Sequence, residues 1–155
     1  MRSIRKPGWL RQFLVRLFAV ALALNWFWEM LQMPGFEQMM GRPWRTTVLT
    51  CTVAALGDAA ITLGIYALVA LITKRWRWPS EGRWKTYLAA SLSGAAVAIV
   101  IEKASLAVDF WSYSSRMPVV PVFGAGFWPL LQLTLLVPLA MRLSSGWISR
   151  RQIRE

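Results

Sequence analysis

Two acidic residues lie inside apolar stretches of the sequence, where acid–base chemistry is the natural expectation. Glu102 is followed by Lys103 in "AIVIEKASLAV", and Asp58 stands alone in "LGDAAITL". An ionised side chain at the centre of a bilayer costs roughly 2.5–3.5 kcal/mol on insertion scales, so such residues face the protein interior and find partners. Asp58 and Glu102 must therefore be paired, protonated or in contact with water. We predict them as catalytic residues that give or take a proton.

Other polar residues recur in the apolar stretches and predict a binding site around these acids. Asn25 and Glu29 are four apart in "NWFWEMLQMP" and share one helix face, and Gln132 interrupts a further apolar stretch. Lys103 does not face Glu102, because adjacent helical residues point about 100° apart. It could neutralise an acid on another helix or extend toward the headgroups. We predict Asn25, Glu29, Lys103 and Gln132 as binding residues.

The segment "DFWSYSSRMPVVPVFGAGFWPLLQ" supplies a third set of binding residues. Trp111, Tyr113 and Arg116 combine aromatic rings with a cation that could orient a polar head group. Pro118 and Pro121 bias their predecessors to extended conformations, which predicts an ordered, hairpin-like cap over the polar residues. The alternative is an aromatic belt at the membrane surface.

Four apolar segments must position these residues. A bilayer core about 30 Å thick needs roughly 20 helical residues to cross it. Segments near this length occur at 13–31, 48–73, 87–108 and 122–141. The composition of the 155 residues agrees, since 56% are hydrophobic and 16% are charged. We predict an all-α fold, a four-transmembrane-helix bundle that forms a single integral membrane domain over residues 1–155.

The distribution of Lys and Arg predicts the orientation of the bundle, because these residues accumulate in short cytoplasmic loops. Thirteen lie before the first segment, between the second and third, and after the fourth: Arg2, Arg5, Lys6, Arg11, Lys74, Arg75, Arg77, Arg83, Lys85, Arg142, Arg150, Arg151 and Arg154. Three lie in the other two loops: Arg42, Arg45 and Arg116. Both termini are therefore predicted to be cytoplasmic. This bias accounts for most of the net charge of +11 without a nucleic-acid partner.

With this orientation, each segment places a polar side chain in the outer half of the membrane. At 1.5 Å per residue, Asn25 and Glu102 lie about 9 Å, and Asp58 and Gln132 about 15 Å, below the outer boundary. Steps of three and four also predict one packed stripe on the third segment, since small residues let membrane helices approach closely. The stripe comprises Ser91, Ala95, Ala98, Glu102, Ser105 and Asp109. Gly57 and Gly64 offer a second close-approach surface on the second segment.

Residues that are rare or absent exclude several kinds of chemistry. The chain has no His and a single cysteine, Cys51, which excludes an imidazole base, a Cys/His metal site and an intramolecular disulfide. We predict no metal and no cofactor, and Cys51 is expected to be a packing residue. The stretch "KRWRWPSEGRWK", residues 74–85, joins two spans, so its Trp residues are expected to anchor the chain at the headgroup level rather than to bind nucleic acid.

The stretches "NWFWEMLQMP", "LGDAAITL" and "IEKASLAVDFWSYSSRMPVVPVFGAGFWPLLQ" carry a resemblance. The chain resembles a group of small, uncharacterised bacterial four-helix integral membrane proteins, over Asn25 to Leu139. The resemblance implies a multi-pass protein of the bacterial inner (plasma) membrane, but no activity. A weaker likeness is to membrane-embedded carotenoid and terpenoid cyclases, which use acids among helices. The Pro-x-Glu-Glu type motif of the short lycopene cyclases is absent.

Three functions are compatible with these residues. The first is a protein, enzyme or binder, that admits an isoprenoid or acyl chain from the membrane lipids and acts on it with Asp58 or Glu102. The second is an accessory or assembly subunit of a larger membrane complex, with a membrane-protein partner. The third is a proton-coupled transporter. Four helices are few for alternating access, so that function would require a homo-oligomer, namely a dimer.

Overall fold

The computed structural model describes residues 8–152, and the side chains up to residue 146. The chain is mostly helical, at 78%. Its elements are α1 (Trp9–Gln32), η1 (Met33–Gly35), η2 (Glu37–Met39), α2 (Trp44–Thr73), α3 (Trp78–Glu81), α4 (Trp84–Ala107), β1 (Val119–Val120), β2 (Ala125–Gly126) and α5 (Phe127–Gln152). Of the cationic residues used to predict orientation, Arg2, Arg5, Lys6 and Arg154 lie outside the described residues.

Four of the described helices are long and apolar enough to cross a membrane, which confirms the number predicted from the sequence. The candidate spans are Trp9–Gly35, Trp44–Thr73, Trp84–Ala107 and Phe127–Gly146. The last begins at Phe127 rather than at Val122. The reason is local: residues 119–126 form a hairpin, in which Gly124 adopts a positive φ of 62° and turns the chain back.

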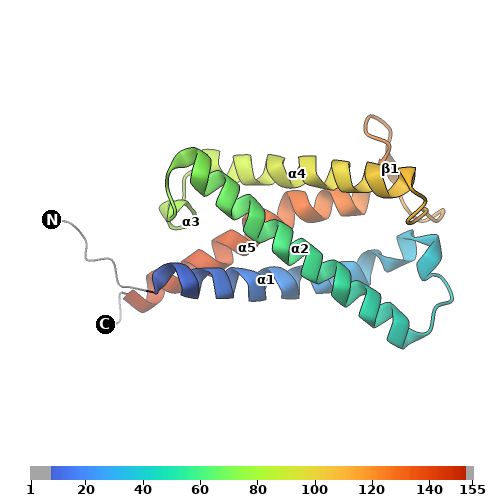
Figure 1. The fold of residues 1–155 in the computed structure, drawn as a ribbon, viewed down its shortest axis with the longest axis horizontal. Helices are drawn as coiled ribbons and strands as arrows, with labels where there is room; N and C mark the ends of the chain where they lie inside the picture. Colours follow the sequence, from blue (N-terminus) through green and yellow to red (C-terminus); the bar gives the residue numbers. More distant parts are fainter. Residues whose placement is uncertain (1–7, 153–155) are drawn as a thin grey trace.

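The helices pack as a bundle in which α2 crosses the others obliquely. Helix α1 packs against α2 and α5, and α4 packs chiefly against α5. The short connection through α3 holds the end of α2 close to the start of α4, whereas their opposite ends diverge (Figure 1). The start of α1 and the end of α5 lie at the end of the bundle that carries α3.

The buried face of α4 differs from the predicted stripe. The buried residues are four apart, at Thr86, Ala90, Gly94, Ala98 and Glu102. Of the predicted stripe, Ala98 and Glu102 are buried, whereas Asp109 is exposed beyond the helix end. Residues four apart form one of the ridges along which helices pack, so the contact with α5 follows that ridge. A Cβ at Gly94 would collide with the carbonyl oxygen of Leu133 on α5.

The predicted close-approach surface on α2 is not used within the described chain. Gly57 and Gly64 are both exposed, and no atom lies within 4 Å of a Cβ built on either residue. Helix α2 instead buries Cys51, Ala55 and Ala59. The spacing of small residues on a helix therefore does not determine which other helix, if any, packs against them.

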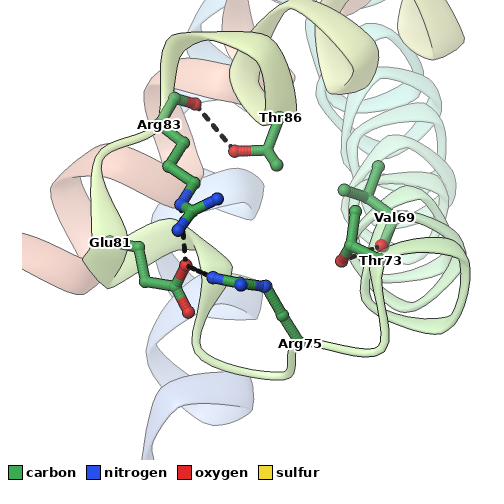
Figure 2. Close-up of polar contacts among 6 residues, drawn as sticks. All are labelled: Val69, Thr73, Arg75, Glu81, Arg83 and Thr86. Atoms are coloured by element: carbon green, nitrogen blue, oxygen red, sulfur yellow. Dashed lines mark hydrogen bonds and ion pairs between the residues drawn. The ribbon is translucent and has the colours of Figure 1, made fainter.

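A connection rich in cations and Trp closes the α3 end of the bundle. Arg75 and Arg83 converge on Glu81, whose Oε2 lies 2.7 Å from Nη1 of Arg75 and 3.3 Å from Nε of Arg83 (Figure 2). Trp78 differs from the expected interfacial anchor, because its ring is 0% exposed and packs between Tyr66 and Tyr87. Helix α3 turns this ring into the bundle. Trp76 and Trp84 remain exposed, as an interfacial position requires.

At the other end, the two long loops join into one structure, which we call the loop cap (residues 33–43 and 108–126). Phe36 and Tyr113 form an antiparallel bridge. Ser114 donates from its backbone N to the carbonyl of Gly35 (2.9 Å) and from its Oγ to that of Pro34 (2.7 Å). Segments about 80 positions apart are thus fixed side by side over the ends of α1 and α4.

Candidate functional site

The side-chain amide of Gln132, on α5, brings together polar residues from three helices. Its Nε2 lies 2.9 Å from Oδ1 of Asn25 and 3.0 Å from Oε1 of Glu29, both on α1. The same nitrogen lies 2.7 Å from Oδ2 of Asp58 on α2. An amide nitrogen has two hydrogens, so three acceptors share two donors. The structure therefore brings the predicted residues Asn25, Glu29, Asp58 and Gln132 together in one cluster.

Gln32 completes this cluster and was not identified from the sequence. Its Nε2 donates to Oε1 of Glu29 (2.8 Å) and to Oε1 of Gln132 (2.9 Å). Its own Oε1 accepts the indole N–H of Trp28 at 3.1 Å. The sequence prediction ended the first span at Leu31, which assigned Gln32 to a loop. The available signal was its spacing of three from Glu29, which continues the face that Asn25 and Glu29 share. We call Asn25, Glu29, Gln32, Asp58 and Gln132 the glutamine cluster.

Burial differs among the members of the glutamine cluster. Asn25 and Gln132 are 0% and 2% exposed, so the amides are inside the protein. Asn25 also donates to the carbonyl oxygen of Ala21, one turn earlier, at 2.8 Å. Glu29 and Asp58 are only partly buried. The two carboxyl groups therefore lie at the edge of the cluster and the amides at its centre.

Glu102 has a separate set of partners at the base of the loop cap. It is 3% exposed and accepts a hydrogen bond from the hydroxyl of Tyr113 on its Oε2. The Tyr113 hydroxyl in turn accepts the backbone N–H of Gly126 at 2.7 Å. Burial, and then this bond to Glu102, raise the pKa of Tyr113 above its ordinary value. Trp111 stacks edge-on against Phe36, with ring centroids 5.8 Å apart.

The two predicted cationic residues lie outside both sets of contacts. Lys103 is exposed on α4, turned away from the buried Glu102 by the helical step between them. Arg116 is exposed in the loop cap, where its backbone N–H donates to Oγ of Ser114. The two predicted acids therefore have different hydrogen-bond partners: Asp58 bonds to Gln132, and Glu102 bonds to Tyr113.

The carboxyl, amide and hydroxyl groups in these two sets of contacts suit proton transfer and hydrogen bonding. Within the residues that the structure describes, no three acidic or cysteine side chains converge in a way that could hold a metal ion. Comparisons of the chain with protein-family models, with curated proteins and with solved structures find no match.

Proposed function

We propose that the protein binds the polar end of a lipid or isoprenoid-type molecule at the glutamine cluster and transforms it by acid–base chemistry. One observation carries this proposal: Glu29 and Asp58 each place a carboxyl oxygen within 3.0 Å of the same Gln132 nitrogen. Two carboxyl groups held so close in a medium of low dielectric constant can share one proton. A pair that carries one proton can act as an acid with one member and as a base with the other.

The roles of the residues follow from this sharing and from their burial. Asp58 is the proposed acid: it carries the shared proton and gives it to the substrate, while Glu29 takes a proton from the substrate, so that the pair keeps a single negative charge. Gln132 and Asn25, both buried, fix the positions of the carboxyl groups. Glu102 is the proposed second acid, oriented by Tyr113 at the base of the loop cap. Trp111 and Arg116 of the loop cap would contact the polar end of the substrate.

The membrane setting is part of the proposal. We place both termini in the cytoplasm of a bacterial cell and the loop cap outside its inner membrane. The connection between α2 and α4 carries Lys74, Arg75, Arg77, Arg83 and Lys85, whereas the loops at the other end carry Arg42, Arg45 and Arg116. In this orientation the glutamine cluster lies in the outer half of the bilayer. A substrate would reach it from the outer leaflet.

Mass spectrometry of lipids bound to the natively purified protein tests this function. We would compare wild type, Asp58→Asn, and the control Thr134→Val, since among the described residues Thr134 Oγ1 bonds only the Leu130 carbonyl of its own helix. Wild type and control should retain the same isoprenoid or acyl compounds. Asp58→Asn should retain the substrate and lack its product. Identical compounds in all three proteins, in the same ratio, would exclude the acid role of Asp58.

A second candidate function is that of an accessory subunit of a membrane complex. The observation that favours it is the exposed surface around Gly57 and Gly64 on α2, which no other described part of the chain covers. Small residues on a membrane helix allow another helix to approach closely. This function predicts that a second membrane protein co-purifies in stoichiometric amount. Its loss in Gly57→Leu, with the lipid content unchanged, would separate the two candidates.

A further inference from the structure

The hairpin of the loop cap presents an apolar tip on a buried base. Val119 and Val120 pair with Gly126 and Ala125. At the base, Ala125 is 0% exposed and Met117 is buried. At the tip, Val122 is 84% exposed, and Phe123 beside it is also exposed. A firmly packed base therefore holds large apolar side chains away from the protein.

The tip belongs to a long segment without charge. No Asp, Glu, Lys or Arg occurs between Arg116 and Arg142, so the hairpin is continuous with the uncharged part of α5. Phe127 and Trp128, the first residues of α5 after the hairpin, are exposed as well. These side chains belong to the surface that a membrane-spanning helix presents to lipid.

The direction in which the hairpin projects indicates whether its tip meets lipid or water. The hairpin projects sideways past the end of α4, across the helix axes (Figure 1). The loop that leads into α2 and contains Arg42 extends instead beyond the end of the bundle. If the helices cross a bilayer, a sideways projection at their ends reaches the neighbouring lipid. A projection along their axes reaches the aqueous phase.

We infer that the hairpin tip, Val122 and Phe123, inserts into the lipid at the surface of the bilayer leaflet on the loop-cap side. The partner is the boundary between phospholipid headgroups and acyl chains, where short apolar and aromatic side chains are favourable. Arg116, exposed before the hairpin, lies within the same loop cap and can reach lipid phosphate groups. The insertion fixes the depth of the loop cap, and with it Tyr113, relative to the membrane.

Site-specific fluorescence in vesicles tests this insertion. In a Cys51→Ala background, which removes the only cysteine, single cysteines replace Val122 or Arg42 and carry the environment-sensitive dye NBD. The full chain is reconstituted in vesicles of phosphatidylcholine and phosphatidylglycerol. Emission at position 122 should shift to shorter wavelength, and a doxyl-labelled phosphatidylcholine should quench it. Iodide should quench it several-fold less than it quenches position 42.

Two outcomes would overturn the inference. Equal quenching of both positions by iodide would place the tip in water. Protection from iodide without quenching by the doxyl lipid would mean that protein covers the tip, and in these vesicles that protein is a second copy of the chain. Dilution of the protein in lipid separates the second outcome from insertion, because only a contact between copies weakens on dilution. Neither outcome depends on the function proposed for the glutamine cluster.

Discussion

The amide nitrogen of Gln132 lies 2.7 Å from a carboxyl oxygen of Asp58, although the residues are 74 positions apart and on different helices. This contact links α2 to α5, which otherwise meet less extensively than α1 does with either. Because the same amide also donates to Asn25 and Glu29, one side chain on α5 bonds to acceptors on both α1 and α2.

Gln132→Leu should therefore destabilise the bundle more than the loss of an average interhelical hydrogen bond. Such bonds contribute about 0.6 kcal/mol in a membrane protein. Leucine would leave three buried or partly buried acceptors without this donor, and we expect a cost of about 1–3 kcal/mol. Unfolding in mixed detergent micelles, with Thr134→Val as the control, measures the difference. A change no larger than that of the control would show that the acceptors find other donors.

Asp58→Asn and Glu29→Gln should not have additive effects on stability. Both carboxyl groups accept from the same nitrogen of Gln132, so neutralising one changes the surroundings of the other. Residues in one hydrogen-bond network show coupling of about 0.5–3 kcal/mol in double-mutant cycles. The cycle requires the free energy of unfolding of the two single variants and the double variant at one pH. Additivity within a few tenths of a kcal/mol would mean that the carboxyl groups act independently.

Tyr113 should titrate later than the ordinary tyrosine pKa of about 10. Its burial and its bond to Glu102 raise the pKa, so the folded state favours the protonated hydroxyl. The stability that this group contributes is present below pH 10 and is lost as the pH rises above it. Absorbance at alkaline pH, compared between wild type and Tyr113→Phe, isolates this titration among the three tyrosines. A difference centred at or below pH 10 would contradict the partial burial of the hydroxyl and its bond to Glu102.

Hydropathy and spacing predicted the helical parts of this fold better than the contacts between helices. Asn25 and Glu29 lie on one face because they are four apart on one helix, a relationship that the sequence contains. The contact of Asp58 with Gln132 depends on which helices are neighbours and on their crossing, which spacing does not determine. Trp78 was expected at the membrane surface, since Trp commonly lies there. The short helix α3 instead places its ring between Tyr66 and Tyr87.

The position of Glu102 beside the loop cap likewise depends on tertiary structure. Glu102 was predicted on a packed face, and it is buried. Its partner Tyr113 follows the end of α4, and the chain must turn back at Asp109, with φ 52°, before the two side chains can meet. A non-glycine residue in this conformation is uncommon, although Asp adopts it more often than most residues do.

Gly94 determines how closely α4 approaches α5, and its substitution tests the packing that positions Glu102 on the same face. A Cβ at this position would collide with the carbonyl oxygen of Leu133, which is backbone and cannot rotate away. Gly94→Ala should therefore force the helices apart and cost about 1–3 kcal/mol of stability. Gly64→Ala is the matched control, because Gly64 is also helical and nothing lies within 4 Å of the added Cβ. In detergent it should be neutral or stabilising, by up to about 1 kcal/mol of helix propensity. Equal stability of the two variants would mean that α4 and α5 lie further apart at this point than the close approach requires.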